Sequence, residues 1–328
     1  MNSKFSFIII SYNEKEYLPQ AIDSCINQKL TNYEVIIGDD GSSDGSIEVI
    51  KEYQKKYPSI IKYFVSDRSN VCKETLIASL RVSAVIERAL SIACGEYCMI
   101  LSGDDYLYEG GFISRAKEFL DNNPEYVSYV GGYEKVWPDQ PSVAFFSNYS
   151  PKIYWSGEYI HLTAFVFRKK VFDTGCFLQR FCDDAGLVYA LACSGKWKYD
   201  NQLVFAYRQR SSSIMHTVDQ LEFRIVELMI FQDILCKGQL LNASRSHYAK
   251  SLWYVFEHRK ELNQEKYDKY LKNCSNYNCN IIKMLQDYDK DCFTKKVTVY
   301  LKLIYAKVVS KVYKAVRLLK KDKRNIYV

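Results

Sequence analysis

Residues 97–105 of this chain are Tyr97-Cys98-Met99-Ile100-Leu101-Ser102-Gly103-Asp104-Asp105. An uninterrupted apolar run of this length is typical of a strand that is buried on both faces. The Asp pair therefore follows a strand end, and in open α/β sheets ligands bind beyond the carboxyl ends of the strands. Two adjacent carboxylates there favour a divalent cation that carries a phosphate ligand. The alternative is a turn without a ligand, because Ser, Gly and Asp are common at any strand end.

Strands and helices alternate on both sides of this stretch. In chain order we predict strand 5–10, helix 16–28, strand 33–37, helix 46–57, strand 60–65, helix 82–93, strand 97–101, helix 111–120, strand 126–130, a short apolar run at 162–167, helix 183–193 and strand 199–207. The segments without a firm period are expected to be irregular: 66–79, 137–159 and 208–216. Up to residue 101 the alternation indicates βαβ units, and hence a parallel sheet with right-handed crossovers.

A second acidic turn, Asp39-Asp40, follows the strand predicted at 33–37. Since the carboxyl ends of parallel strands meet at one edge of a sheet, we expect these two carboxylates to lie at the same edge as Asp104 and Asp105. The alternative is again a turn that binds nothing. Two acidic turns at one edge indicate a binding site more specifically than either turn alone.

The composition is that of a folded protein, with 48% apolar and 25% charged residues in a chain of 328. The 11 Cys residues include no C-x-x-C pair, which indicates reduced thiols in the cytoplasm rather than a disulfide framework. The sequence contains neither a recognisable secretory signal nor an apolar run of the roughly 20 residues that a membrane span needs. It also lacks the glycine motifs of dinucleotide-binding and P-loop proteins.

The net charge of +7 is unevenly distributed. Residues 294–324 contain nine Lys and two Arg against one Asp, so this segment carries +10 and the rest of the chain about −3. The segment predicts an amphipathic helix that either packs on the protein or lies on an anionic membrane surface, and we expect the membrane. Nucleic acid is not expected as a partner, because the remainder of the chain is acidic. The predicted parts are an α/β domain at 1–216, a helical extension at 217–293, and the basic helix and tail at 294–328.

Taken in order, five motifs resemble those of an inverting glycosyltransferase of family 2. They lie at 8–14 (IIISYNE), 39–45 (DDGSSDG), 93–97 (ACGEY) leading into 102–105 (SGDD), 183–184 (DD), and 207–208 (YR) with Ser213. The resemblance covers residues 4–216. It implies a GT-A fold, in which a Rossmann-like, mostly parallel sheet is flanked by helices. The α-helical C-terminal extension would follow this domain.

The resemblance implies one set of residues that bind the nucleotide sugar: Ser11, Tyr12, Glu14, Asp39, Asp40, Arg81, Asp104 and Arg210. In this set Ser11 and Tyr12 would pack on the base, and the carboxylates of the first Asp pair would face it. Uracil offers a ring N–H to such a carboxylate, so UDP is the expected nucleotide. Asp104 would approach the ribose.

The resemblance also implies the residues of the reaction. Asp184 matches the general base, with Asp183 in the place of a preceding Glu. Asp105 would bind Mn²⁺ or Mg²⁺ on the diphosphate, with His216 as a further candidate ligand. Arg210 occupies a position where many members have His, and we expect it to contact a phosphate oxygen directly.

The expected function is metal-dependent, inverting transfer of a sugar, of the hexosyltransferase type. The donor would be a UDP-sugar, and the acceptor a hydroxyl of a glycan or lipid-linked glycan in bacterial surface-polysaccharide assembly. The protein would be cytoplasmic and peripheral at the inner face of the cell membrane. The alternatives are a catalytically silent nucleotide-sugar-binding protein and a membrane scaffold of a polysaccharide assembly complex.

Overall fold

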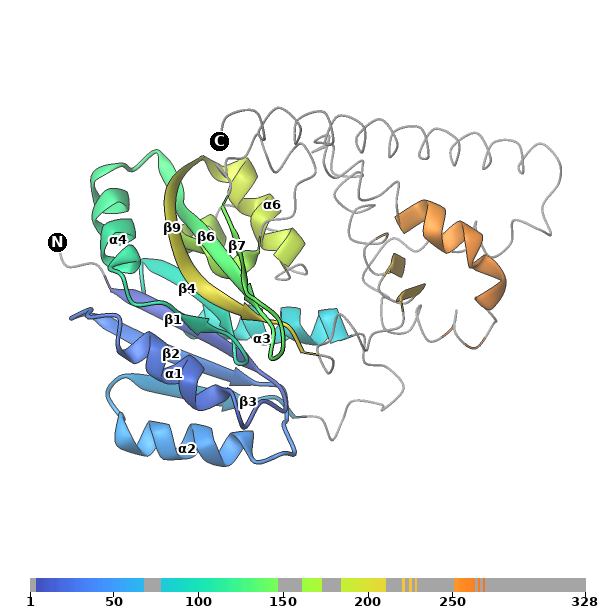
Figure 1. The fold of residues 1–328 in the computed structure, drawn as a ribbon, viewed down its shortest axis with the longest axis horizontal. Helices are drawn as coiled ribbons and strands as arrows, with labels where there is room; N and C mark the ends of the chain where they lie inside the picture. The colour runs from blue at the N-terminus through green and yellow to red at the C-terminus, as the bar shows by residue number, and fades with distance from the viewer. Residues whose placement is uncertain are drawn as a thin grey trace. The chain divides into compact units, whose positions relative to one another are not determined.

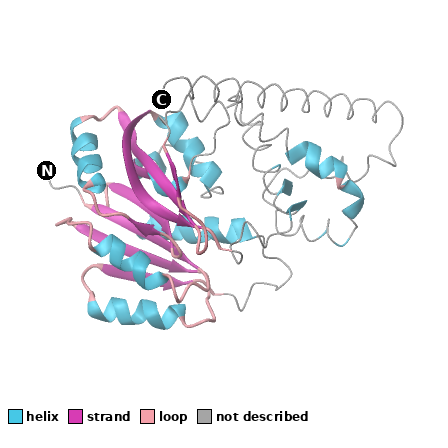
Figure 2. Cartoon of the chain, viewed as in Figure 1, coloured by secondary structure: helices cyan, strands magenta, loops and turns pink. Residues whose placement is uncertain are grey.

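The computed structural model describes residues 4–67, 78–146, 161–172, 184–210, 220, 221, 224, 225, 228, 251–262, 265 and 268. Contacts divide the chain into two units. One comprises Met1–Val71, Ala78–Pro151 and Ile160–His216, and the other comprises Cys72–Ile77, Lys152–Tyr159 and Thr217–Val328. Figures 1 and 2 show that the strands form one curled sheet in the first unit.

The first half of the sheet is parallel, as the alternation of strands and helices predicted. It contains β1 (Phe5–Ser11), β2 (Tyr33–Asp39), β3 (Ile61–Val65) and β4 (Tyr97–Ser102) in the order β3-β2-β1-β4. The strand β1 lies between β2 and β4, and its register pairs Ser11 with Asp39 and Ile10 with Ser102. Both acidic turns therefore begin at the same edge of the sheet, on either side of β1.

The second half of the sheet is mixed, in keeping with the mostly parallel sheet that the resemblance implied. Its strands are β5 (Tyr106–Leu107), β6 (Tyr126–Val136), β7 (Val143–Phe145), β8 (Phe165–Arg168) and β9 (Lys196–Arg208). The strand β8 runs antiparallel to both β4 and β6, whereas β6 and β9 are parallel. The order continues β4-β8-β6-β9-β5, so β9 reaches the turn after β4 through the short strand β5.

Helices form where apolar residues recur at helical spacing. They are α1 (Leu18–Ile26), α2 (Ser46–Lys56), α3 (Ala78–Ile92), α4 (Phe112–Asn122) and α6 (Asp184–Ser194), with short 3₁₀ turns η1 (Leu162–Ala164), η2 (Lys169–Phe172) and η3 (Arg259–Glu261). Both α1 and α3 pack against β1 and β2, which covers the parallel half of the sheet. The N-caps of α2 and α4 are Gly45 and Gly111, which adopt positive φ angles of 98° and 72°.

The core is centred on β4. Its residues from Tyr97 to Leu101 are each at most 2% exposed, which confirms the prediction of a strand buried on both faces. Three predicted boundaries were wrong: α3 begins at Ala78, β6 continues to Val136, and β9 begins at Lys196. The extension of β6 passes through Gly131, where a Cβ atom would lie 2.1 Å from Val204 Cγ2. Glycine thus lets β9 approach β6 closely, which periodicity does not reveal.

Several expectations concern residues outside the described part of the chain. These are the loop at 68–77, most of the helical extension at 217–293 and the basic tail at 294–328. Within the extension, residues 251–257 are helical, as predicted, and Leu252 and Val255 are buried. Among the described residues, the helices are too short or too polar to cross a membrane. The segment predicted to be irregular at 137–159 contains the short strand β7.

A buried carboxylate ties together the amino ends of the parallel strands. Glu34 of β2 accepts hydrogen bonds from Ser6 Oγ at 2.7 Å, the Cys94 backbone N–H at 2.6 Å and Lys4 Nζ at 3.2 Å, and it forms an ion pair with Lys62 Nζ at 2.8 Å. Burial acts to raise the pKa of Glu34, but these donors outweigh it and lower the pKa to about 2. The carboxylate is therefore ionised and fully paired in the folded chain.

We predict that Glu34→Gln destabilises the fold in a pH-dependent way. A carboxylate with a lowered pKa stabilises the folded state above its unfolded pKa of about 4.3, and this contribution is lost as the pH falls toward the folded value. At pH 7 the variant should lose roughly 1.5–3 kcal/mol of unfolding free energy, the range for a hydrogen bond to a charged group. Denaturant unfolding from pH 7 down to pH 3 measures this, and the gap between variant and wild type should narrow below about pH 4.5. A gap that stays constant over this range would contradict the prediction.

Candidate active site

The candidate site lies at the carboxyl ends of β1, β2 and β4. The turns after β2 and β4 are each hydrogen-bonded to the end of β1. The Asp40 N–H donates to Ser11 O at 2.9 Å, and the Gly103 N–H donates to Ile10 O at 2.8 Å. The acidic turns are thus held against the end of the first strand, with the segment from Tyr12 onward between them.

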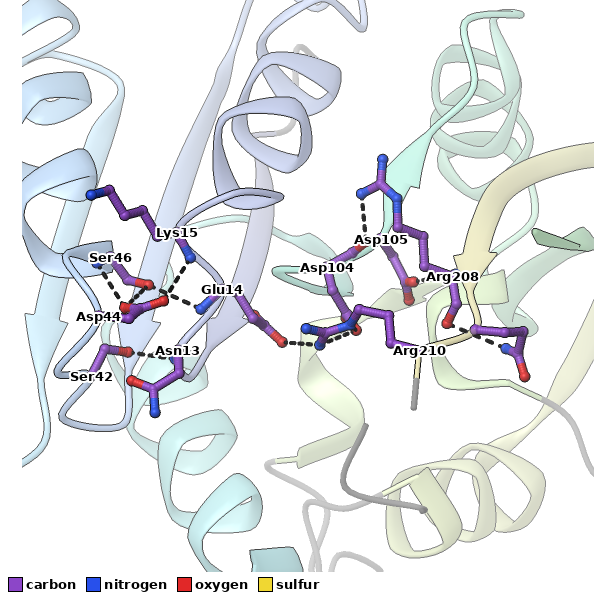
Figure 3. A network of polar contacts seen from close by, with 11 residues as sticks. Asn13, Glu14, Lys15, Ser42, Asp44, Ser46, Asp104, Asp105, Arg208 and Arg210 are labelled. Atoms are coloured by element: carbon purple, nitrogen blue, oxygen red, sulfur yellow. Dashed lines mark hydrogen bonds and ion pairs between the residues drawn. The ribbon is translucent and has the colours of Figure 1, made fainter. Parts of the chain in front are cut away.

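Side chains join the turn after β1 to the turn after β2 (Figure 3). The Asn13 N–H donates to Ser42 Oγ at 2.8 Å, and the Lys15 N–H donates to Asp44 Oδ2 at 3.0 Å. Ser46 Oγ accepts from the Glu14 N–H at 3.0 Å and donates to Asp44 Oδ1 at 2.6 Å. This network fixes the backbone at Glu14, so the Ser-rich sequence after Asp40 has a positioning role that we did not predict.

The first Asp pair divides into two different environments. Asp39 is buried, and its two carboxylate oxygens accept from the Ser42 N–H and Ser42 Oγ, both at 2.7 Å. This is the geometry of the turn that the sequence left open as the alternative. Asp40 instead faces Arg81, whose Nε donates to Asp40 Oδ2 at 2.6 Å.

Arg81 also contacts the turn after β1. Its guanidinium carbon lies 4.9 Å from the centre of the Tyr12 ring. The structure therefore brings together three of the predicted nucleotide-binding residues: Tyr12, Asp40 and Arg81. Nearby in the sequence, Ser11 Oγ is buried and, within the described part of the chain, has no hydrogen-bond partner.

The second Asp pair belongs to an acidic cluster, which we define as Glu14, Asp104 and Asp105 (Figure 3). Arg210 joins two members of this cluster. Its Nε donates to Asp104 Oδ2 at 2.8 Å, and its Nη2 lies 3.2 Å from Glu14 Oε1. The other side of the guanidinium is covered by an aromatic ring, because its carbon lies 4.9 Å from the Tyr17 ring centre.

Arg208, the last residue of β9, contacts both Asp residues of the cluster. Its backbone N–H donates to Asp105 Oδ1 at 2.9 Å, and its Nη1 donates to the Asp104 carbonyl oxygen at 2.7 Å. The guanidinium lies 4.8 Å from the Tyr106 ring centre and 5.0 Å from that of Tyr17. The sequence motif at 207–208 predicted no role for Arg208, so its contacts with the Asp pair are a finding of the structure.

Two carboxylate oxygens of the cluster are buried without a partner. Among the described residues, Asp105 Oδ2 and Glu14 Oε2 accept no hydrogen bond, and the two residues are 0% and 8% exposed. Burial, and then the charge of Asp104, raises the pKa of both carboxyl groups well above the usual range. In the free chain these two groups therefore resist ionisation.

The open oxygens fit a divalent cation whose remaining ligands come from a bound molecule. Buried carboxylate oxygens are the ligands that Mg²⁺ and Mn²⁺ prefer. Within the described ranges, no three His, Cys, Asp or Glu side chains are grouped so that they could hold a metal ion. A cation here would therefore be bound mainly through Asp105, with a phosphate or water completing its coordination.

The remaining predicted residues are described only in part. Asp184 is the first residue of α6, so the helix predicted to begin at 183–184 is present, but only its backbone is described. Asp183 and His216 lie outside the described residues. Their predicted roles, and that of Asp184 as a base, stay predictions.

Comparison with known proteins supports the α/β domain. The family described as Glycosyl transferase family 2 matches residues 6–176. Among solved structures, the chain is similar to residues 1–349 of S. aureus TarS in complex with UDP-GlcNAc, with a TM-score of 0.56 and 15% identity. The likeness covers 95% of this chain and 92% of the TarS chain. It confirms the expected GT-A fold.

Curated relatives match over a shorter segment. An uncharacterized protein of Mycobacterium bovis is 35% identical over 122 residues, which are 37% of this chain and 32% of that protein. The poly(ribitol-phosphate) beta-glucosyltransferase of Bacillus spizizenii is 31% identical over 106 residues, which are 32% of this chain and 15% of that protein. The matched segments thus span a third or less of the length of these relatives.

We predict that Asp105→Asn stabilises the free chain at alkaline pH. An acid whose pKa is raised by folding stabilises the folded state only below its unfolded pKa, and this contribution is lost as the pH rises through the folded pKa. With EDTA present at pH 8, the variant should therefore unfold at a higher temperature than the wild type. Its free energy of unfolding should be higher by on the order of 1–3 kcal/mol. The gain should fade toward pH 4–5, where the wild-type carboxyl is protonated.

Asp200→Asn provides the matched control for this measurement. Asp200 lies on β9, and its carboxylate accepts hydrogen bonds from Arg115 Nη2 at 2.9 Å and Tyr129 Oη at 2.8 Å. Its replacement removes these bonds and should give no stabilisation at any pH. If Asp105→Asn were as unstable as this control at pH 8, the burial penalty at Asp105 would be absent.

Proposed function

The chain belongs to glycosyl transferase family 2, and from this premise we propose that it transfers a sugar from a UDP-sugar to a hydroxyl group of a glycan or lipid-linked glycan. One observation carries this proposal. The buried acidic cluster at the end of β4 has open carboxylate oxygens and lies beside two arginines, Arg208 and Arg210. Such a site suits a diphosphate that arrives with a divalent cation, because it offers ligands for the cation and donors for the phosphate oxygens.

The turn after β2 is the proposed place of the nucleotide base. The Tyr12 ring and the Arg81 guanidinium offer flat surfaces on which a base can stack. Asp40 offers a carboxylate that can accept from the ring N–H of uracil. The Ser11 hydroxyl, which has no hydrogen-bond partner among the described residues, lies at the end of the neighbouring strand β1. UDP-GlcNAc is the natural first donor to test, because TarS was crystallised with it.

The leaving group is the next requirement of the reaction. When the donor's sugar–oxygen bond breaks, the departing diphosphate gains negative charge. A Mn²⁺ or Mg²⁺ ion bound through Asp105 would supply Lewis-acid neutralisation of that charge. Arg210 is proposed to donate to a phosphate oxygen, which a planar guanidinium does well.

The acceptor hydroxyl must lose its proton as it attacks the sugar. We propose Asp184 as the general base that takes this proton, on the face of the sugar opposite the leaving diphosphate, so that the reaction inverts the anomeric centre. Asp184 begins α6, which places it at the N-terminal end of a helix. The acceptor is proposed to be a cell-surface polymer, in keeping with the relative that glucosylates poly(ribitol phosphate).

We predict that Asp105→Asn and Asp184→Asn each lower transfer from the accepted UDP-sugar by at least about 100-fold, since one alters the leaving-group site and the other removes the base. Release of UDP from a panel of UDP-sugars, with Mn²⁺ and candidate glycan acceptors, measures this. Asp200→Asn is the control, because its carboxylate pairs with Arg115 and lies outside the acidic cluster. It should retain wild-type activity.

Two outcomes would argue against the proposal. Full activity of both Asp105→Asn and Asp184→Asn would contradict the roles of these residues. Binding of a UDP-sugar without release of UDP, under any acceptor and metal condition, would favour the alternative of a catalytically silent binding protein.

A further inference from the structure

We propose that Arg210 is a built-in counter-ion that keeps divalent cations out of the acidic cluster until a diphosphate binds. This inference rests on the proposed function, since it concerns the same site. It adds an order of binding: the free chain excludes the cation, and the diphosphate and the cation then bind together. Arg210 is held by Asp104 and Glu14, it forms ion pairs with both, and it leaves one oxygen of Glu14 open.

Arg210 is fixed on three sides. Its guanidinium contacts Asp104 through Nε at 2.8 Å and Glu14 through Nη2 at 3.2 Å. Both carboxylates are more than nine-tenths buried. On a third side the guanidinium lies over the Tyr17 ring, 4.9 Å from its centre. A cation that approached Asp104 or Glu14 in the free chain would therefore meet a positive charge that is already in place.

Arg210 is also the arginine that forms the described ion pairs of the cluster. The side chain of Arg208 donates to the Asp104 carbonyl oxygen and to Gln20 Oε1, so its described hydrogen bonds go to neutral acceptors. The ion pairs recorded for Glu14 and Asp104 both go to Arg210. Removing its charge would leave Asp104 and Glu14 without this counter-ion beside the open oxygen of Asp105, which favours the approach of a divalent cation to Asp105.

The open oxygens show that the cluster is built for a further ligand. Asp105 Oδ2 and Glu14 Oε2 are buried and, in the described part of the chain, accept no hydrogen bond. Unpaired buried oxygens are costly in a folded protein, so they indicate a partner that arrives later. Arg210 pairs with the other oxygen of Glu14, and in the described part of the chain Asp105 Oδ2 accepts no hydrogen bond from it, so these two oxygens stay available to a cation.

A diphosphate would change this balance. Its oxygens are strong acceptors for a guanidinium, so Arg210 could pair with the phosphate instead of with Asp104 and Glu14. The released carboxylates and the phosphate together would then favour a cation beside Asp105. Binding of the diphosphate and of the cation should therefore be coupled, and thermodynamic reciprocity requires that each raises the affinity for the other by the same factor.

Titration with Mn²⁺ alone, followed by calorimetry or by the electron paramagnetic resonance of free Mn²⁺, tests the inference on the full chain. The variants are Arg210→Met, which keeps an apolar side chain over Tyr17, and Arg210→Lys, which keeps the charge. Arg115→Met is the matched control, because it removes an arginine of equal charge from the pair with Asp200. Each protein is titrated with and without UDP.

We expect Arg210→Met to bind Mn²⁺ at least about tenfold more tightly than the wild type without UDP, a typical size for coupling between ligands. Arg210→Lys and Arg115→Met should resemble the wild type. UDP should raise the Mn²⁺ affinity of the wild type by at least a similar factor, and it should raise that of Arg210→Met less.

Equal Mn²⁺ affinity of the wild type and Arg210→Met without UDP would overturn the inference. If Arg210→Met does not fold, the wild type decides alone, because tight Mn²⁺ binding that UDP does not change would also overturn it. Failure of the proposed function gives a different result, namely no binding of UDP and no sugar transfer, while the Mn²⁺ comparison between wild type and variant still stands.

Discussion

The site depends on one constraint, the burial of carboxylates at the end of a strand that is itself fully buried. Because β4 lies in the middle of the sheet, the turn that follows it starts inside the protein. Gly103 allows Glu14 to join this turn, since a Cβ atom at Gly103 would lie 2.3 Å from Glu14 Oε2. Burial keeps Asp105 and Glu14 away from water, and in the proposed function a ligand from outside supplies the partner that water does not.

The pKa values of the buried carboxyl groups shift in opposite directions at the two ends of the parallel strands. At the amino edge, Glu34 is buried but receives donors from four residues, so the pKa of Glu34 falls to about 2 and the group strengthens the fold. At the carboxyl edge, burial raises the pKa of Asp105, which has an oxygen without a partner among the described residues. A buried acid with an unpaired oxygen weakens the free protein, and groups with perturbed pKa values are concentrated at functional sites.

The sequence was sufficient for the parallel half of the sheet and for the place of the site. The sequence predicted β1 to β4 because each strand is a short run of mainly apolar residues. It did not reveal the mixed half, where β6 and β9 depend on Gly131 for their close approach. Nor did it predict the contacts of Arg208 and Arg210, because these residues meet Asp104 only after folding has joined β9 and β5.

The central claim is that the acidic cluster receives the diphosphate of the donor. A crystal structure of the chain with UDP and Mn²⁺, with anomalous scattering recorded at the manganese edge, tests it most directly. The account predicts an anomalous peak beside Asp105 Oδ2, the diphosphate in contact with Arg210, and the uracil beside Tyr12 and Asp40. UDP bound elsewhere, with Arg210 still paired to Asp104 and Glu14 and with no peak at Asp105, would contradict it.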